Sequence, residues 1–327
     1  MKAFTYAKAR DVADAVGSVG SRPGATFIAG GTDLLNLMKD GAQIHDQLID
    51  INGLPLAGIT QEQGVVKIGG LARMGDVAAH PLIRRTFPVL SEALLASASP
   101  QVRNMAAIGG NLLQRTRCGY FRDVGSPCNK RAPGSGCSAI GGENRGHAVL
   151  GGSESCIAVQ PSDLAVALLA LDATVVATGP SGERRIPFDE FYLLPGNSPD
   201  RETVLGHGDL IVGVEIPTSA LALRSRYLKL RDRATFEFAV VSVAAALNLR
   251  GQVVQDVRLT FGGVATKPWR SREAEAALRG RALTEASITD AGQAAVAGAV
   301  AREHNAFKIE LLRRALSVIV KDLGGVR

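Results

Sequence analysis

Four cysteines confined to one glycine-rich stretch are the feature that most constrains this chain. Cys118, Cys128, Cys137 and Cys156 are the only cysteines among 327 residues, and they fall within 39 positions. Glycine occupies nine of those positions, and no helical or strand period of apolar residues runs through them. A structureless stretch of this length inside a compact protein is uncommon unless it is functional or is held by something other than a core.

The spacing C-x9-C-x8-C-x18-C is compatible with several roles for the four cysteines. Structural zinc sites usually use short C-x2–4-C pairs, which are absent here. Disulfides need an oxidising compartment, and no export signal is visible. An iron–sulfur cluster needs four thiolates from flexible loops, and glycine-rich loops supply them. Basic neighbours, which lower thiol pKa and offset cluster charge, crowd the stretch: Arg115, Arg117, Arg122, Lys130 and Arg131. The pattern favours a metal centre, iron–sulfur ahead of zinc, over four unrelated buried cysteines.

Composition and charge exclude several classes of protein. Hydrophobic residues make up 46% and charged residues 21%, which is typical of a globular protein and excludes disordered, collagen-like and coiled-coil chains. The net charge is +6, but basic runs reach only two residues, so we expect a solvated surface and no nucleic-acid site. The N-terminus has no signal-type apolar segment. The longest apolar run, 164–171, is too short for a membrane span, and a soluble chain is predicted.

The apolar pattern predicts a small α/β unit, then the cysteine stretch, then mainly strands and terminal helices. In the first hundred residues we expect strands at 26–29, 47–51 and 65–68, and helices at 33–39 and 88–96. Thr32 or Asp33 is the expected N-cap of the helix at 33–39. Pro161-Ser162-Asp163 begins a further short helix, and Asn305 is the expected N-cap of a helix through Leu323. Later strands are expected at 174–177, 210–216, 227–231, 238–249 and 253–261.

Two glycine turns are candidates for binding a dinucleotide. Ala29-Gly30-Gly31-Thr32-Asp33-Leu34 joins a predicted strand to a helix, where glycines let backbone N–H groups approach a phosphate. It is neither GxGxxG nor a P-loop. Gly109-Gly110-Asn111 lies about 80 residues later. Each turn alone is a weak signal. Used together, they suit a dinucleotide whose pyrophosphate lies between two subdomains.

The order of three motifs resembles one family. Phe27-Ile28-Ala29-Gly30-Gly31-Thr32-Asp33-Leu34-Leu35, Arg103-Asn104-x-Ala106-x-x-Gly109-Gly110-Asn111 and Pro161-Ser162-Asp163-Leu164 are similar to motifs of the FAD-binding medium subunits of molybdenum hydroxylases, the xanthine dehydrogenase and carbon monoxide dehydrogenase family. The resemblance covers essentially the whole chain. Three motifs in this order are far more specific than any one of them.

The cysteine stretch resembles one branch of that family. Residues 111–118 (NLLQRTRC), 127–131 (PCNKR) and 133–137 (PGSGC) are similar to the FAD subunit of bacterial periplasmic aldehyde oxidoreductases. In that branch an insertion, here 113–156, carries four cysteines that ligate a 4Fe–4S cluster. The resemblance therefore implies that Cys118, Cys128, Cys137 and Cys156 are the cluster ligands.

The resemblance implies an α+β fold with two domains. Residues 1–220 would form a two-subdomain FAD-binding domain of the molybdenum hydroxylase (PCMH) type, and residues 221–327 a C-terminal α+β domain with an antiparallel sheet and helices. The family's FAD contacts map onto Thr26, Phe27, Ile28, Ala29, Gly30, Gly31, Thr32, Asp33, Leu34, Ala107, Gly109, Gly110, Asn111, Asp163, Ile211 and Lys229. The family often has a hydroxyl residue at Ala107, so one side-chain bond to FAD is expected to be lost. Tyr192 falls in a loop that is near the isoalloxazine in the family.

The function implied is electron transfer within a heterotrimeric molybdenum-dependent aldehyde oxidoreductase. A large molybdopterin-binding subunit would oxidise the aldehyde, and a small subunit with two 2Fe–2S clusters would pass electrons to FAD on this chain and on to an external acceptor. No catalytic residue is expected in this chain, and His147 is expected to be solvated or structural.

Two alternatives stay open, and so does the compartment. The chain could be a zinc-stabilised interaction protein held by its four cysteines, or a self-sufficient FAD oxidase. The resemblance implies the periplasm, reached by export of the folded complex with a signal-bearing small subunit. A cytoplasmic location is the alternative.

Overall fold

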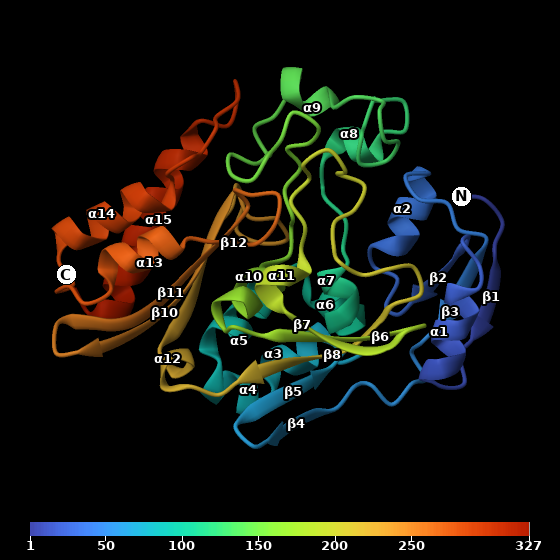
Figure 1. The fold of residues 1–327 in the computed structure, drawn as a ribbon, viewed down its shortest axis with the longest axis horizontal. Helices are drawn as coiled ribbons and strands as arrows, with labels where there is room; N and C mark the ends of the chain where they lie inside the picture. Colours follow the sequence, from blue (N-terminus) through green and yellow to red (C-terminus); the bar gives the residue numbers. More distant parts are fainter. Residues whose placement is uncertain (327) are drawn as a thin grey trace.

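The computed structural model describes residues 1–326 and arranges them around three separate sheets. Figure 1 shows the N-terminal sheet on the right, a five-stranded sheet at the bottom and the C-terminal sheet on the left. The cysteine stretch, in green, projects at the top between the outer two. In residues 1–326, no helix combines the length and apolar character that crossing a bilayer requires.

The N-terminal sheet is parallel, with strand order β1-β3-β2. Helix α1 connects β1 to β2 and α2 connects β2 to β3, because parallel neighbours need crossover connections. The elements are β1 (Thr5–Lys8), α1 (Val12–Gly20), β2 (Ala25–Ile28), α2 (Leu34–Asp40) and β3 (Gln47–Asp50). The strands and the helix predicted in this segment are confirmed.

The five-stranded sheet is antiparallel, with order β4-β5-β8-β6-β7. Its strands are β4 (Ile59–Glu62), β5 (Val65–Gly69), β6 (Thr174–Gly179), β7 (Gly182–Pro187) and β8 (Leu210–Pro217). Helices form the rest of this unit: α3 (Met74–Ala79), α4 (Pro81–Thr86), α5 (Pro88–Ala96), α6 (Pro100–Met105), α7 (Ile108–Leu112), α10 (Asp163–Ala170) and α11 (Phe188–Phe191). All eight residues of α10 are buried, and those after Asp163 join the largest apolar core.

The cysteine insertion contains little regular structure. Between α7 and α10 it forms only α8 (Gly119–Arg122) and α9 (Ser138–Gly141). An isolated antiparallel bridge pairs Cys128 with Cys137. The lack of an apolar period in the sequence therefore corresponds to a real lack of long helices and strands.

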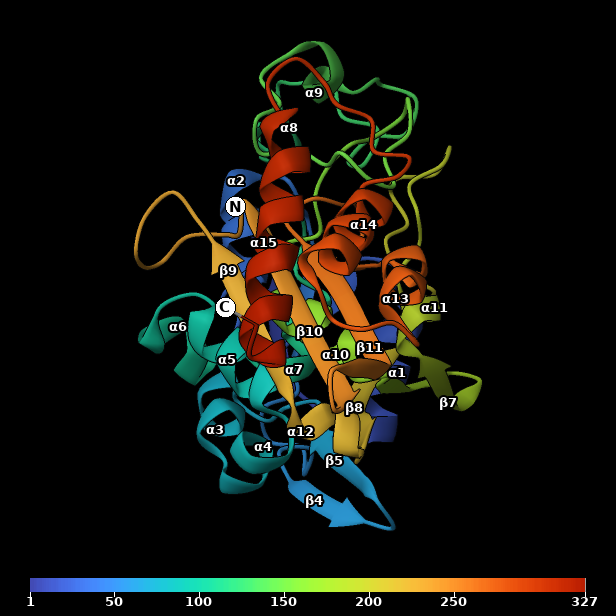
Figure 2. The same ribbon diagram turned by 90° about the vertical axis from the view of Figure 1, so that its left-hand side faces the viewer.

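The C-terminal sheet is antiparallel, with order β12-β11-β10-β9. Figure 2 shows α13, α14 and α15 on one face of this sheet, while α10 packs against β10 and β11 from the opposite side. The elements are β9 (Ser225–Leu230), β10 (Val241–Arg250), β11 (Val253–Gly262), β12 (Trp269–Arg270), α12 (Ala220–Leu223), α13 (Arg272–Leu278), α14 (Glu285–Ala295) and α15 (Phe307–Gly324).

Two boundary predictions in this part were wrong. Strand β10 begins at Val241, so residues 238–240 lie outside it. Helix α15 has Ala306 at its N-cap position, so Asn305 is not the cap. The Asn305 side chain is buried and binds the cysteine insertion, as described below.

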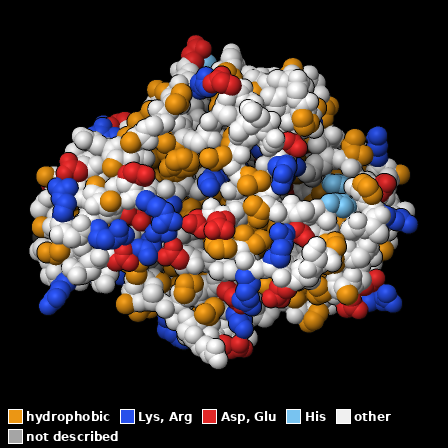
Figure 3. Space-filling view, viewed as in Figure 1, with side chains coloured by type: hydrophobic (Ala, Val, Ile, Leu, Met, Phe, Trp, Pro, Cys, Tyr) orange, Lys and Arg blue, Asp and Glu red, His pale blue; other side chains and the backbone are white. Residues whose placement is uncertain are grey.

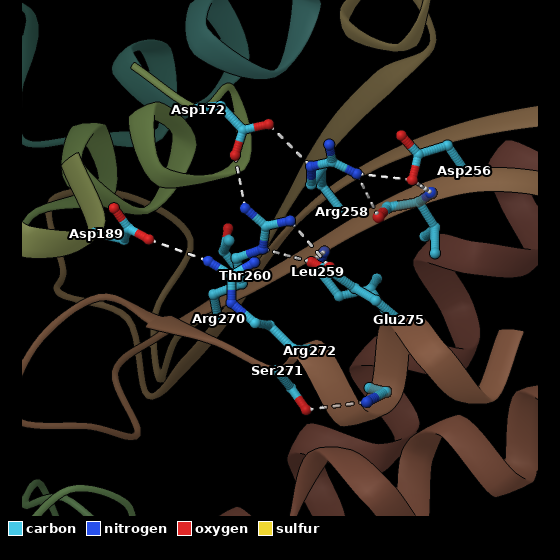
Figure 4. Close-up of polar contacts among 12 residues, drawn as sticks. Asp172, Asp189, Asp256, Arg258, Leu259, Thr260, Arg270, Ser271, Arg272 and Glu275 are labelled. Atoms are coloured by element: carbon cyan, nitrogen blue, oxygen red, sulfur yellow. Dashed lines mark hydrogen bonds and ion pairs between the residues drawn. The ribbon is translucent and has the colours of Figure 1, made fainter. Parts of the chain in front are cut away.

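A polar network joins the C-terminal sheet to the helices of the second unit (Figure 4). Asp172, just after α10, accepts hydrogen bonds from Arg258 (2.9 Å) and Arg270 (2.6 Å). Arg270 also pairs with both carboxylate oxygens of the buried Glu275, at 2.8 and 3.0 Å.

A second contact between the two units is an ion pair, in which Arg272 of α13 pairs with Asp189 of α11 at 3.0 Å. On this face the charges alternate in sign, and Figure 3 shows acidic and basic side chains mixed over α13 and β12.

Candidate functional site

The two glycine turns lie against each other, although they are far apart in sequence. The first follows β2, and its Gly31 has a left-handed backbone (φ +67°) that favours glycine. A Cβ on Gly30 would lie 2.0 Å from the carbonyl oxygen of Met105 at the end of α6. Only glycine therefore allows the first turn to approach the segment that leads into α7. Of the other predicted residues, Thr26, Phe27 and Ile28 lie in β2, Ala29 and Thr32 in the turn, and Leu34 begins α2.

Helix α7 carries the second glycine turn. Ala107 is its N-cap and makes no side-chain cap bond, as expected for a residue without a hydroxyl. A Cβ on Gly109 would meet the Gly70 carbonyl at 3.2 Å and the Ile211 side chain at 3.3 Å. The predicted residue Ile211 is thus buried directly behind α7. Gly110 has no heavy atom within 4 Å of the corresponding position, so this side of α7 is open.

Asn111 connects the second glycine turn to the Pro-Ser-Asp motif. Its side-chain oxygen accepts a hydrogen bond from the Ser162 hydroxyl at 2.6 Å. Ser162 is in turn the N-cap of α10 and accepts from the Ala165 N–H at 3.0 Å. All three motifs that carry the family resemblance therefore meet in one region.

Asp163 and Lys229, both predicted to contact FAD, form a buried ion pair with each other. Their oxygen and nitrogen lie 2.8 Å apart, and the side chains are 5% and 3% exposed. Asp163 also accepts hydrogen bonds from Tyr227 (2.6 Å) and Ser97 (2.9 Å). Burial, and then the Asp163 charge, raises the pKa of Tyr227 well above its usual value. Ser97 and Tyr227 were missed because nothing in the local sequence marks them as partners of position 163.

Asp33 faces the cysteine insertion. It occupies the N-cap position of α2, as predicted, although its side chain makes no cap hydrogen bond. The carboxylate instead accepts from the Arg115 N–H at 2.9 Å and from the guanidinium groups of Arg117 and Arg122. Arg122 also binds Asp40 at the end of α2 at 3.0 Å. Asp33 therefore ties the first glycine turn to the segment that leads to Cys118.

A cavity of about 220 Å³ lies beside Asp163. Ser242 Oγ on its wall is buried and makes no hydrogen bond of ordinary geometry with the described residues, although the Tyr227 hydroxyl lies close to it. Gln160, Ser162 and Lys308 also line it. An unsatisfied hydroxyl next to a buried carboxylate suits a ligand with ring nitrogens and hydroxyls, and FAD has both.

Tyr192 lines a second cavity, of about 270 Å³. The Tyr192 ring is buried, and its hydroxyl donates to the Leu112 carbonyl at 2.8 Å. Gln160, the residue before the Pro-Ser-Asp motif, lines both cavities.

All four cysteines line one small cavity inside the insertion. None forms a disulfide; Cys128 and Cys156 are buried, and the other two are half-buried. Burial raises the pKa of Cys118 to about 11 and raises that of Cys156. In residues 1–326, no three His, Cys, Asp or Glu side chains converge so as to hold a single metal ion. We call this cavity the cysteine pocket.

Asn129 brings three of the cysteine segments together. Its side-chain amide donates to the Ser155 carbonyl at 3.0 Å, and its side-chain oxygen accepts from the Gly136 N–H at 2.8 Å. These partners precede Cys156 and Cys137, while Asn129 itself follows Cys128. The sequence offered no signal for this role beyond the position next to a cysteine.

The basic residues of the insertion organise its loops. Lys130 pairs with Glu202 at 2.7 Å and donates to the Pro199 carbonyl at 2.8 Å. Arg115 pairs with the same Glu202 at 2.5 Å. Arg131 donates to the carbonyls of residues 120 and 121, at 2.9 and 2.6 Å. Charged and backbone contacts thus supplement a small apolar cluster, in which Phe121 and Cys128 pack against Leu37 and Ala42.

The C-terminal half of the insertion is attached to the last helix. Lys308 is fully buried, and its ammonium donates to the carbonyls of His147 (3.0 Å) and Gly263 (2.7 Å). Burial lowers the pKa of Lys308 to about 7. Asn305 donates to the Ala148 carbonyl at 3.2 Å, and Asn144 accepts from the residue 304 N–H at 3.0 Å. The insertion therefore connects the first glycine turn with the C-terminal unit.

Comparison of the sequence with known protein families identifies the family to which these three motifs belong. Residues 2–219 match the FAD binding domain in molybdopterin dehydrogenase. The chain belongs to this family. Residues 226–321 match the CO dehydrogenase flavoprotein C-terminal domain. The chain is therefore an FAD-binding medium subunit of the molybdenum hydroxylases, and this confirms the predicted family, the α+β class and the assignment as an oxidoreductase subunit.

Individual relatives support the same assignment. The medium subunit is 48% identical to the aldehyde oxidoreductase FAD-binding subunit PaoB of Escherichia coli, over 98% of each chain. It is 29% identical to the carbon monoxide dehydrogenase medium chain of Hydrogenophaga pseudoflava, over 90% of this chain and 86% of the relative. A solved carbon monoxide dehydrogenase structure from Hydrogenophaga pseudoflava superposes with a TM-score of 0.78 at 26% identity, covering 99% of this chain and 98% of that one.

Proposed function

We propose that this medium subunit carries electrons within a heterotrimeric molybdenum-dependent aldehyde oxidoreductase. A large molybdopterin-binding subunit oxidises the aldehyde, a small subunit with two 2Fe–2S clusters relays the electrons, and this chain delivers them to an external acceptor. The observation that carries the proposal is the 48% identity to an aldehyde oxidoreductase FAD-binding subunit over 98% of both chains. No residue of this chain acts on the aldehyde.

FAD is held, in this proposal, by the region where the three motifs meet. FAD supplies redox chemistry when it is bound, while the chain supplies binding and orientation. Backbone groups of the turn from Thr26 to Leu34 and of Gly109 to Asn111 form the two walls. The Asp163–Lys229 pair and Ile211 complete the site. Because Ala107 offers no side-chain hydrogen bond, backbone groups carry more of the binding. The proposed boundary between the FAD-binding and C-terminal domains lies at residue 220.

We further propose that the cysteine pocket holds a 4Fe–4S cluster. Each thiolate of such a cluster binds a different iron atom, so the four sulfurs must surround a cavity rather than meet at one ion. Cys118, Cys128, Cys137 and Cys156 line one cavity, and the buried Lys130 next to it offsets negative charge. The donor set fits the cluster. The complex is proposed to act in the periplasm after export with a signal-bearing small subunit, and the N-terminal sequence of that subunit tests the location.

Anaerobic purification of the tagged full-length chain tests this function. We expect flavin absorption, iron and sulfide in the preparation, together with molybdenum and two further chains. A colourless, zinc-loaded chain would support the interaction-protein alternative. A flavin-containing chain that purifies alone, without molybdenum, and oxidises a substrate by itself would support the oxidase alternative.

Substitution of Gly110 tests the second wall of the FAD site. Ala is expected to leave the fold intact, because its Cβ meets no protein atom within 4 Å and alanine favours a helix. If FAD occupies this open side, the methyl group should weaken FAD binding at least about tenfold, or roughly 1.4 kcal/mol. The measurement is FAD titration of the apo chain. Gly17→Ala is the matched control, since Gly17 also lies in a helix with an open side. Equal FAD affinity in the two variants would remove Gly110 from the site.

A further inference from the structure

His147 is buried next to Cys118, one of the residues that line the cysteine pocket. Its Nε2 is 3.2 Å from the Cys118 sulfur. The residue is 8% exposed, and Nδ1 of its ring is buried without a hydrogen-bond partner among the described residues. His147 was expected to be solvated or structural, but the ring points one nitrogen at a proposed cluster ligand.

The position of the ring is set by the C-terminal unit. The His147 carbonyl accepts from the Lys308 ammonium at 3.0 Å, and the next carbonyl accepts from Asn305 at 3.2 Å. The His147 N–H donates to the Asn144 carbonyl at 2.9 Å. Backbone bonds on both sides thus hold the main chain at His147, and the burial of the residue restricts the movement of its ring.

The direction of the hydrogen bond between His147 and Cys118 follows from the chemistry of an imidazole and a metal-bound thiolate. A metal-bound thiolate has lone pairs but no proton, so a hydrogen bond to it requires the proton on Nε2. With that tautomer, no ring N–H is left without an acceptor, because the partnerless Nδ1 carries no proton. Hydrogen bonds to cluster sulfurs stabilise the more negative, reduced cluster and so raise its reduction potential.

We propose that His147 is a positioning residue that donates a hydrogen bond from Nε2 to the Cys118 ligand and raises the reduction potential of the 4Fe–4S cluster. This inference rests on the cluster assignment made above. It assigns the histidine a role that is separate from ligation, because four cysteines already fill the ligand positions.

Redox titration monitored by electron paramagnetic resonance tests the proposal in the anaerobically purified complex. His147→Phe should retain iron and sulfide but shift the midpoint potential of the 4Fe–4S signal to a more negative value. His147→Gln keeps an N–H donor and should fall between Phe and the unmodified chain. His304→Phe is the matched control, because its ring is 40% exposed, approaches the insertion only at Glu143 (3.8 Å) among the described residues and does not line the cysteine pocket, and it should leave the potential unchanged.

A second measurement uses the unmodified chain, so its result does not depend on whether the His147 variants fold. With ¹⁵N-histidine labelling, pulsed magnetic resonance of the reduced cluster should detect one coupled histidine nitrogen. An unchanged potential in His147→Phe, or a cluster with no coupled nitrogen, would overturn the proposal while leaving the cluster assignment intact. A chain that contains no iron would overturn the cluster assignment itself.

Discussion

Replacing Asp163 with alanine is expected to lower the free energy of unfolding of the apo chain by about 3–5 kcal/mol. Among residues 1–326, the substitution leaves the Lys229 ammonium without a countercharge and with the Ala96 carbonyl as its one hydrogen-bond acceptor, on a side chain that is 3% exposed. It also removes the acceptor of the buried Tyr227 hydroxyl. Removing one partner of a buried ion pair lowers the free energy of unfolding by far more than the intact pair contributes to it, because the remaining charge stays desolvated. Urea unfolding, followed by circular dichroism, measures the change.

Two further variants separate this effect from a general loss of charge. Asp232→Ala removes one partner of the Arg145–Asp232 pair, whose side chains are 52% and 54% exposed, and should cost at most about 1 kcal/mol. The double variant Asp163→Asn with Lys229→Met should recover much of the lost stability, because no buried charge is left alone. If Asp163→Ala destabilises no more than Asp232→Ala, the pair is not buried in solution as described.

Replacing Cys156 with serine is expected to remove most of the roughly four iron atoms that a 4Fe–4S cluster carries per chain. Cys156 is buried on the wall of the cysteine pocket, and serine is a poor ligand for iron in such clusters. Because the insertion has no apolar core of its own, loss of the cluster should also make residues 113–156 more sensitive to limited proteolysis. Iron analysis and peptide mapping after brief protease treatment measure the two effects.

Ala158→Ser is the matched control for this substitution. Ala158 is also buried and lines the same cavity, so the variant places a hydroxyl there while keeping all four thiols. It should retain its iron. FAD content should change little in either variant, because the FAD walls lie outside the cysteine pocket. Full iron content in Cys156→Ser would contradict the assignment of this cysteine as a ligand.

Much of the fold was predictable because its central elements carry strong apolar patterns. Helix α10 and strands β5, β6 and β11 are rich in apolar residues and were identified near their observed bounds. The edge strands β4 and β7 were missed. They read ITQE and GERRIP, and most of their residues are exposed, so no alternation of apolar and polar residues marks them. Their strand structure comes from pairing with β5 and β6.

The motifs assigned Asp33 and Asp163 to one FAD site, which stays a prediction, but they did not indicate the partners of these side chains. Their carboxylates bind arginines of the insertion and Lys229, respectively, and these partners lie between 66 and 89 positions away. Such pairings depend on how distant segments are packed, which a local pattern does not encode. The same reason explains why Asn305 was assigned to a helix cap rather than to the insertion.

The attachment of the insertion to the last helix has a consequence for biosynthesis. The carbonyl of His147 receives its hydrogen bond from a residue 161 positions later in the chain. During translation the N-terminal part emerges and begins to fold first, well before α15 exists. The segment around His147, which contacts Cys118, therefore takes its final form only after α15 has been synthesised. We accordingly expect the 4Fe–4S cluster proposed above to be inserted after the C-terminal unit has closed on this segment.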